Sequence, residues 1–320
     1  MWRSPRTGVL GGSFNPVHRD HMELALLARE LCALDEVLFV PNNAPPHRHA
    51  PQTAYADRLA MLALAVEPYQ SCNFKLSDLE SEPKVNHYTY DTLKRLRAQV
   101  GPQHGLFFIL GLDSLLYLDE WHKGLQLTDY AHLVCIARVG YTLSLPEHKE
   151  ALRAYIENRA LLIGEDTAKM PTEDLSQAVP KKAPADSAQG QPAGIAQSEQ
   201  RVQPTQSDIT TQYAVNSQPN TPNTPDTAVD AASEAESAPG LPLSIRSKER
   251  WRGELQEILS APCGQILVVR RKLHELSSTV LRQTLAQYYI SGNDTLLQSL
   301  QGLIDPVVLR YILSRRLYAP

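Results

Sequence analysis

The chain has 320 residues, of which 42% are hydrophobic and 21% are charged, and its formal net charge is −4 at pH 7. This length allows one large domain or two smaller ones. A weakly negative charge gives no overall basic surface, which argues against a dedicated nucleic-acid-binding protein. No apolar run is long enough to span a bilayer, and the first six residues lead into a predicted strand without the pattern of a signal peptide. The four cysteines are scattered without a C-x-x-C pair, which favours reduced thiols in a cytoplasmic protein over a zinc site or a disulfide framework.

The stretch from Gly11 to His21, GGSFNPVHRDH, joins a predicted strand at 7–10 to a predicted helix at 22–31. Two glycines allow backbone N–H groups to approach a phosphate closely, and the start of a helix adds free N–H donors and the positive end of the helix dipole. His18 and His21 are three residues apart, so they share one face if both lie in the first turn. The stretch therefore predicts phosphate binding, and the two imidazoles favour phosphoryl or nucleotidyl transfer. The stretch matches neither the dinucleotide fingerprint nor the P-loop.

Strand and helix patterns alternate along the rest of the chain. Strands are predicted at 37–40, 74–76, 106–110, 132–136 and 265–269, and helices at 57–66, 88–96, 249–259, 295–303 and 306–313. This alternation predicts right-handed β-α-β units and hence an α/β fold, a Rossmann-like parallel sheet with helices on both faces. Ligands of such sheets bind beyond the carboxyl ends of the strands, so the residues after each strand are candidates for the site.

Two of these strand ends carry polar or aromatic residues. Asn42 and Asn43 follow the 37–40 strand in a proline-rich loop, where they favour turns and donate hydrogen bonds, although an ordinary surface loop is the alternative. Asp113 follows the 106–110 strand, and its carboxylate can accept from ribose hydroxyls, hold magnesium or cap the next helix. Trp121 either stacks on the aromatic ring of a ligand or belongs to the core.

A second phosphate-binding segment is predicted near the end of the chain, at 277–282. Ser277 or Ser278 is suited to cap a helix, and the hydroxyls of this segment together with free N–H groups form a cradle for phosphate. Arg282, one turn further on, can point back to the cradle with a bidentate guanidinium. The alternative is a plain capped helix with a solvent-facing arginine.

The composition changes between 164 and 243, where Pro, Ala, Ser, Gln, Thr and Asp dominate and periodicity disappears. Such a segment cannot bury enough apolar surface to offset its ordering entropy. We therefore expect a long disordered, low-complexity insertion at 164–243. Because candidate chemistry lies on both sides of it, residues 1–163 and 244–320 are expected to form one domain together.

These stretches together resemble the bacterial nicotinate-nucleotide adenylyltransferases, a family within the HxGH nucleotidyltransferase superfamily. The matching stretches are Gly11–His21, Pro41–Arg48, Tyr88–Thr89, Gly111–Leu116 with Trp121, Ala131–Tyr141 and Ser277–Arg282. The resemblance implies transfer of AMP from ATP to nicotinate mononucleotide, which gives nicotinate adenine dinucleotide and pyrophosphate in NAD biosynthesis. It also implies direct in-line attack without a covalent enzyme intermediate, with Mg²⁺ entering together with ATP and no residue assigned as a metal ligand.

The resemblance also implies roles for individual residues. Those implied for ATP are Gly11, Gly12, Ser13, Phe14, His18, His21, Ser278, Thr279 and Arg282, and of these His18, His21 and Arg282 are implied to be catalytic. Those implied for nicotinate mononucleotide are Asn42, Asn43, Tyr88, Thr89, Asp113 and Trp121. The chain departs from the family pattern at Asn15, where the family usually has Asp, and at Asp20, where it has Gly. Asn15 loses a charge and Asp20 places a carboxylate near phosphates, so either change can lower activity.

Two other functions fit part of the sequence. Phosphopantetheine adenylyltransferase has the same fold and chemistry, but the Pro-Asn-Asn loop and Trp121 argue against it. A nucleotide-binding scaffold with weak catalysis is the other alternative, and Asn15 and Asp20 are its only support. The expected partners are ATP and nicotinate mononucleotide, with no nucleic acid and no membrane. A homo-oligomer is compatible with the sequence, and the 164–243 segment is a candidate contact for an unidentified partner.

Overall fold

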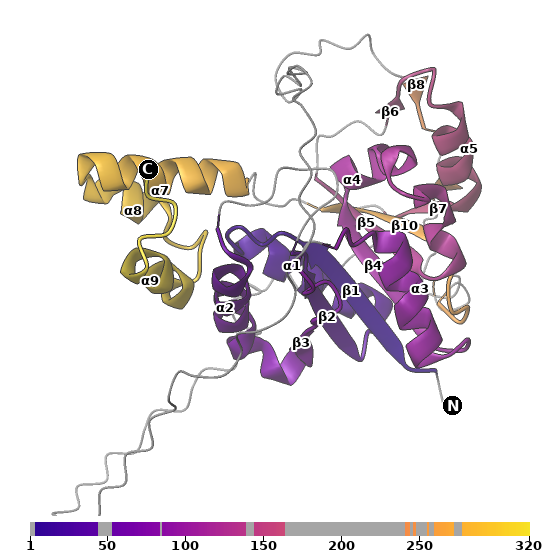
Figure 1. Ribbon diagram of the computed structural model, residues 1–320. Helices are drawn as coiled ribbons and strands as arrows, with labels where there is room; N and C mark the ends of the chain where they lie inside the picture. The colour runs from indigo at the N-terminus through magenta and orange to yellow at the C-terminus, as the bar shows by residue number, and fades with distance from the viewer. Residues whose placement is uncertain are drawn as a thin grey trace, which may run out of the picture. The chain divides into compact units, whose positions relative to one another are not determined.

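An eight-stranded sheet forms the centre of the fold, and all of its neighbouring strands are parallel (Figure 1). In spatial order the strands are β3 (Phe74–Leu76), β2 (Glu36–Pro41), β1 (Arg6–Gly12), β4 (Gly105–Gly111), β5 (His132–Arg138), β10 (Ile266–Arg271), β7 (Ala160–Ile163) and β9 (Arg246–Ser247). The chain moves outward from β1 through β2 to β3 and then crosses to β4, on the other side of β1. The strand order therefore reverses between β1 and β4, which is where parallel α/β sheets hold their ligands.

This computed structural model describes residues 4–43, 53–83, 85–138, 144–163, 241–243, 246–247, 255, 259–271 and 277–320. These residues belong to one unit, Met1–Lys181 with Ala238–Pro320, and a second unit, Lys182–Ser237, lies outside the described residues. Most of the 164–243 segment and most of the predicted helix at 249–259 also lie outside them. Leu241–Pro242 form β8, which pairs antiparallel with β6 (Ser144–Leu145), so secondary structure resumes slightly earlier than the boundary at 243 that the sequence predicts.

The central strands β1, β4 and β5 are buried on both faces, because their residues alternate between two hydrophobic cores. Leu10 and Ile109 belong to the first core, whereas Val9 and Phe108 belong to the second. The first core is covered by α1 (Arg19–Cys32), α2 (Tyr55–Val66), α7 (Ser278–Ser291), α8 (Asp294–Ser299) and α9 (Pro306–Ser314). The second is covered by α3 (Thr89–Val100), α4 (Leu112–Leu116) and α5 (Glu150–Arg159). The predicted α/β fold with helices on both faces of a parallel sheet is confirmed.

The sheet gains a helix and a strand that the sequence did not predict, α5 and β7, which follow one another without a break. Residues 160–163 pair with β10, and β10 pairs with β5, so the missed strand extends the sheet beyond the predicted strands. Three short 3-10 helices complete the helical elements among the described residues, η1 (Glu67–Cys72), η2 (Leu118–Glu120) and η3 (Gly124–Asp129). No helix of the described part combines the length and apolar character needed to cross a membrane.

The C-terminal helices are held against the N-terminal half by polar contacts with α2. Tyr311 on α9 donates its hydroxyl hydrogen to Asp57 Oδ1 at 2.8 Å, and Arg315 Nη2 lies 3.2 Å from the same oxygen. The start of α9 is capped by Asp305, whose side chain accepts from Val307 N–H at 2.7 Å. These contacts bring the last residues of the chain close to the turn after β1.

Candidate active site

Three of the predicted segments meet at the carboxyl ends of neighbouring strands. Gly12 ends β1 opposite Pro41, the last residue of β2, and Asn42 N–H donates to Gly12 O at 3.0 Å. On the other side of β1, Gly111 ends β4. A Cβ atom on Gly111 would lie 2.5 Å from Asp113 Oδ1, so the carboxylate at the start of α4 folds back over this glycine. The turn after β1 therefore lies between the two strand ends predicted to bind substrate.

His18 and His21 lie at the start of α1, at the N-cap and at the third helical position. Their ring centroids are 3.9 Å apart, and the Phe14 ring meets the His21 ring edge-on at 5.1 Å. His18 N–H donates to His21 Nδ1 at 3.2 Å, and this assigns the proton of a neutral His21 to Nε2. Burial lowers the pKa of His21 to about 4, so the imidazole is uncharged at neutral pH. The predicted shared face of the two histidines is confirmed, and His21 can donate a hydrogen bond without carrying a charge.

The start of α7 is bound to the segment that precedes His18. Ser278 Oγ donates to Pro16 O at 3.3 Å, and Arg282 Nη1 donates to Asn15 O at 2.7 Å. Arg282 Nη2 also donates to Thr279 Oγ1 at 3.2 Å, which fixes the guanidinium over the first turn of α7. The two predicted phosphate-binding segments are thus neighbours in space, although these contacts join residues more than 260 positions apart.

The two asparagines after β2 have different surroundings. Asn42 is half-buried, and its Oδ1 atom is inaccessible to solvent and has no hydrogen-bond partner among the described residues. Asn43 Nδ2 donates to Ser81 O at 2.6 Å, so this amide holds the loop to the segment after β3. The Asn43 amide is therefore engaged within the protein, and a ligand at Asn42 would bind through the donor Nδ2 rather than through the enclosed Oδ1. Residues 44–48 of the predicted loop lie outside the described part of the chain.

Tyr88 packs against His122, the residue that follows Trp121 in the chain. Tyr88 is the N-cap residue of α3, directly before Thr89, and its ring centroid is 4.4 Å from that of His122. Trp121 is half-buried, packs against the second core and meets the Phe108 ring edge-on at 6.4 Å. Part of the indole therefore belongs to the core, and the rest is accessible for stacking.

The part of the chain that carries most of the candidate site also matches a known protein family. Residues 9–183 match the model of the cytidylyltransferase-like family. The chain belongs to this family. The match begins within β1 and covers the turn, both histidines and the ends of β2, β4 and β5.

Curated relatives narrow the family membership. The chain is 41% identical over 138 residues to a probable nicotinate-nucleotide adenylyltransferase of Shewanella baltica (strain OS185), covering 43% of this chain and 62% of the relative. It is 38% identical over 168 residues to one of Shewanella sp. (strain W3-18-1), covering 52% of this chain and 74% of the relative. It is 40% identical over 150 residues to one of Aeromonas hydrophila, covering 47% and 69%. Within the cytidylyltransferase-like family, the chain therefore groups with the nicotinate-nucleotide adenylyltransferases, although it spans less than two thirds of the first of these relatives.

Solved structures agree on the fold. The nicotinic acid mononucleotide adenylyltransferase of Plasmodium falciparum, complexed with NaAD, superposes with a TM-score of 0.51 at 15% sequence identity, covering 98% of both chains. Its complex with APC gives the same TM-score at 14% identity, covering 98% of this chain and 97% of that chain. At this identity the likeness concerns the fold alone.

In this cytidylyltransferase-like chain, two residues that sequence analysis missed hold the turn after β1. Arg58 on α2 is 1% exposed and donates to Ser13 O at 2.6 Å and to Asn42 O at 2.7 Å. Tyr318 donates its hydroxyl hydrogen to Asn15 Oδ1 at 2.8 Å, and burial raises the pKa of this tyrosine. The single cation of the predicted helix at 57–66 is the one sequence signal for Arg58, and no local pattern marks Tyr318.

The two departures from the family pattern each have a defined place. Asn15 Oδ1 accepts from Tyr318, an interaction that an amide and a carboxylate can make alike. Asp20 is 3% exposed and lies in the first turn of α1, where the helix dipole favours negative charge. The helix dipole therefore favours the charged form of this carboxylate, and burial opposes it.

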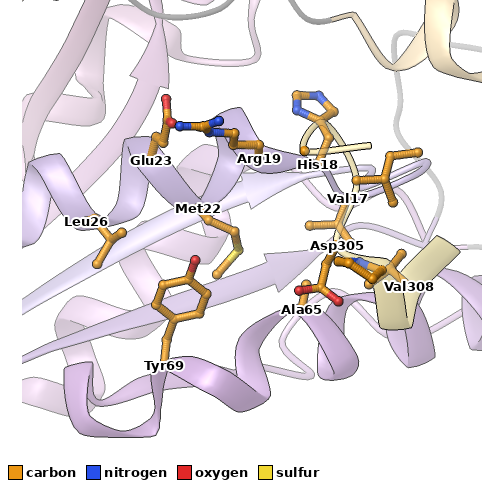
Figure 2. A pocket seen from close by; sticks show the side chains of 13 residues that line it. Val17, His18, Arg19, Met22, Glu23, Leu26, Ala65, Tyr69, Asp305 and Val308 are labelled. Carbon is orange, nitrogen blue, oxygen red and sulfur yellow. The ribbon is translucent and has the colours of Figure 1, made fainter. Parts of the chain in front are cut away.

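A separate pocket of about 400 Å³ borders His18 (Figure 2). It lies between α1, the end of α2 with η1, and the start of α9, and side chains from all of these elements point into it. Its lining is Val17, His18, Arg19, Met22, Glu23, Leu26, Ala65, Tyr69, Gly302, Ile304, Asp305, Pro306 and Val308. His18 is the one predicted site residue in this lining, so the pocket is distinct from the strand-end region where the other predicted residues gather.

Proposed function

We propose that the chain transfers AMP from ATP to nicotinate mononucleotide and releases pyrophosphate and nicotinate adenine dinucleotide. The observation that carries this proposal is the close pair of His18 and His21 beside the start of α7, at the point where the strand order of the sheet reverses. The curated relatives from Shewanella and Aeromonas, which are named nicotinate-nucleotide adenylyltransferases, support the choice of substrates.

The proposed reaction is a single in-line displacement. A phosphate oxygen of nicotinate mononucleotide attacks the α-phosphorus of ATP and forms the new P–O bond. The bond from the α-phosphorus to the bridging oxygen breaks, and the electron pair leaves with pyrophosphate. The chain needs no nucleophile of its own for this step, so its task is to position the two substrates and to stabilise negative charge.

The residues around the turn after β1 can supply that stabilisation. His21 Nε2–H is a neutral donor whose direction is fixed by the hydrogen bond at its other nitrogen. The start of α7 adds the positive end of its helix dipole, with Thr279 N–H already bonded to the Ser277 cap, and Arg282 adds a fixed positive charge for the β- and γ-phosphates. Preorganised donors of this kind stabilise charge that develops on phosphate oxygens in the transition state.

Magnesium is proposed to enter as part of the substrate, the magnesium complex of ATP. Among the described residues there is no group of three His, Cys, Asp or Glu side chains that could hold a metal ion. Mg²⁺ commonly binds through substrate phosphates with few protein ligands, so a donor set without a metal cage fits this role. Asp113, folded over Gly111, is assigned to the ribose hydroxyls of nicotinate mononucleotide because the family resemblance places it in that pocket.

Nicotinate is proposed to be preferred over nicotinamide in the second substrate. The ring carboxylate of nicotinate accepts hydrogen bonds from donors such as the Asn42 amide and the backbone before α3. An amide in the same place would turn its own N–H₂ toward at least one of these donors, which would leave a buried donor without a partner. Trp121 would stack on either ring and therefore contribute equally to both.

A cytoplasmic location is proposed together with this reaction. Cys32, Cys72, Cys135 and Cys263 are free thiols, and the first three are buried. Free, scattered thiols suit the reducing conditions in which cytoplasmic biosynthetic enzymes work.

The test is a turnover assay with the purified chain, ATP and Mg²⁺. Nicotinate mononucleotide, nicotinamide mononucleotide and phosphopantetheine are offered separately, and both pyrophosphate and the adenylylated product are measured. We expect product with nicotinate mononucleotide at a kcat/KM well over tenfold above the nicotinamide form. A preference for phosphopantetheine, or ATP binding without pyrophosphate release, would refute the proposal.

A further inference from the structure

Arg58 joins two loops that the proposed function assigns to different substrates. Its guanidinium donates to Ser13 O in the turn after β1 at 2.6 Å and to Asn42 O in the loop after β2 at 2.7 Å. Its Nε also donates to Thr53 O at 3.3 Å, just before α2. Nη2 also donates to Asn43 O at 3.5 Å, so one planar group binds four backbone carbonyls from three different segments.

The surroundings of Arg58 are unusual for a buried cation. The residue is 1% exposed, and no carboxylate of the described part of the chain pairs with it. The guanidinium carbon lies 5.5 Å from the centre of the Tyr55 ring, and burial lowers the pKa of Arg58. A buried charge without an ionic partner is costly, so its carbonyl partners must hold it in a defined geometry. Only arginine offers a rigid fork that donates in several directions at once.

The support behind Arg58 is rigid. It sits on α2, whose Met61 and Leu62 are fully buried in the first core. A second link joins the same two loops directly, because Asn42 N–H donates to Gly12 O at 3.0 Å. A ligand that orders the turn after β1 therefore also restrains Arg58, and Arg58 in turn binds the loop after β2.

We infer that Arg58 is a positioning residue that couples the ATP turn to the nicotinate mononucleotide loop, so that each substrate raises the affinity for the other. This inference rests on the proposed function, because that function assigns one substrate to each loop. Coupling between binding sites is reciprocal, and typical couplings change affinity about 5-fold or more. Ordering of both loops by the first substrate leaves less ordering to be done by the second.

The test measures binding rather than turnover. Titration calorimetry gives the Kd of a non-hydrolysable ATP analogue, with a methylene between the α- and β-phosphorus, in the absence and presence of saturating nicotinate mononucleotide, and the reverse. We expect each ligand to tighten the other at least about fivefold in the wild type, and by less than about twofold in both Arg58→Lys and Arg58→Met. Lysine keeps the charge but cannot span the carbonyls, so it separates bridging from charge alone.

Arg97→Lys is the matched control. Arg97 likewise donates to backbone carbonyls, at Tyr130, Gly101 and Pro262, but it lies near the start of β4, at the amino ends of the strands, whereas the site lies at their carboxyl ends. We expect this variant to lose stability and to keep the coupling. Loss of coupling in Arg97→Lys, wild-type coupling in Arg58→Lys, or no coupling in the wild type would each overturn the inference.

A measurement on the wild type covers the case in which the Arg58 variants fail to fold. Hydrogen exchange at the Asn42 and Asn43 amides, which donate to Gly12 O and Glu80 O, should slow when the ATP analogue alone is added. Unchanged exchange there would overturn the inference. A wild type that shows coupling but forms no dinucleotide would refute the proposed function alone, and one that forms dinucleotide without coupling would refute this inference alone.

Discussion

Replacing His21 with alanine tests the centre of the proposed reaction. The Nε2–H of neutral His21 is the donor that remains after Nδ1 accepts from His18 N–H. Loss of one preorganised donor to a developing negative charge costs about 2.7–4 kcal/mol, which lowers kcat by about 100- to 1,000-fold. The stability of the fold should change far less, because a hydrogen bond like the one from His18 N–H contributes about 1 kcal/mol.

The assay is pyrophosphate release at saturating ATP and nicotinate mononucleotide, with a chemical unfolding curve as the control for folding. His21→Gln is the matched variant, because glutamine keeps a neutral N–H donor and should retain more turnover than alanine. Since the pKa of His21 is lowered to about 4, its titration should leave kcat unchanged between about pH 6 and 8. Full turnover in a folded His21→Ala protein would show that the histidine does not act on the phosphates.

Three further predictions concern the second substrate and the stability of the fold. Trp121→Ala should raise KM for both mononucleotides and leave the ratio of their kcat/KM values within about twofold, because stacking is common to both rings; a tenfold change in the ratio would contradict this role. Tyr318→Phe removes the donor to Asn15 Oδ1 and should lower the free energy of unfolding in urea by about 1 kcal/mol, and an unchanged midpoint would show that the contact is not formed. Burial lowers the pKa of His132 from 6.5 to about 4, so its neutral form stabilises the fold fully above pH 6.5. Between pH 6.5 and 4 the free energy of unfolding of the wild type should therefore fall by up to about 3 kcal/mol more than that of His132→Gln, a comparison that removes the similar contribution of His21, and equal profiles would refute the assignment.

Local sequence patterns were sufficient for the strands that build the centre of the sheet. The apolar run 106–110 falls within β4 (Gly105–Gly111), because a strand buried on both faces has no polar side to blur the pattern. The strand at 160–163 was missed for the opposite reason. It follows Arg159, the last residue of α5, with no Gly, Pro or Asn between helix and strand to mark the change.

In the candidate site, too, features set by local spacing were predictable from the sequence, and features set by contacts between distant residues were not. The pairing of His18 and His21 is a local consequence of helical spacing, so the sequence predicts it and the structure confirms it. The hydrogen bond from Asn43 Nδ2 to Ser81 O joins residues that are 38 positions apart. The contact of Tyr318 with Asn15 spans 303 positions. Such contacts arise from tertiary packing and leave no periodicity in the sequence.

The position of β10 between β5 and β7 bears on the order in which this chain can assemble. Residues 160–163 are synthesised about a hundred positions before the strand they pair with, and β5 also has β10 as its outer neighbour. Until residues 266–271 emerge from the ribosome, β5 and the side of β7 that faces away from the two-residue β9 both offer free backbone groups to other chains. The N-terminal half is thus a sheet with a gap in its middle, and the later half fills that gap while bringing α7 to the histidines. Nascent or cut chains that lack β10 would accordingly combine an open edge prone to aggregation with a site missing one of its walls.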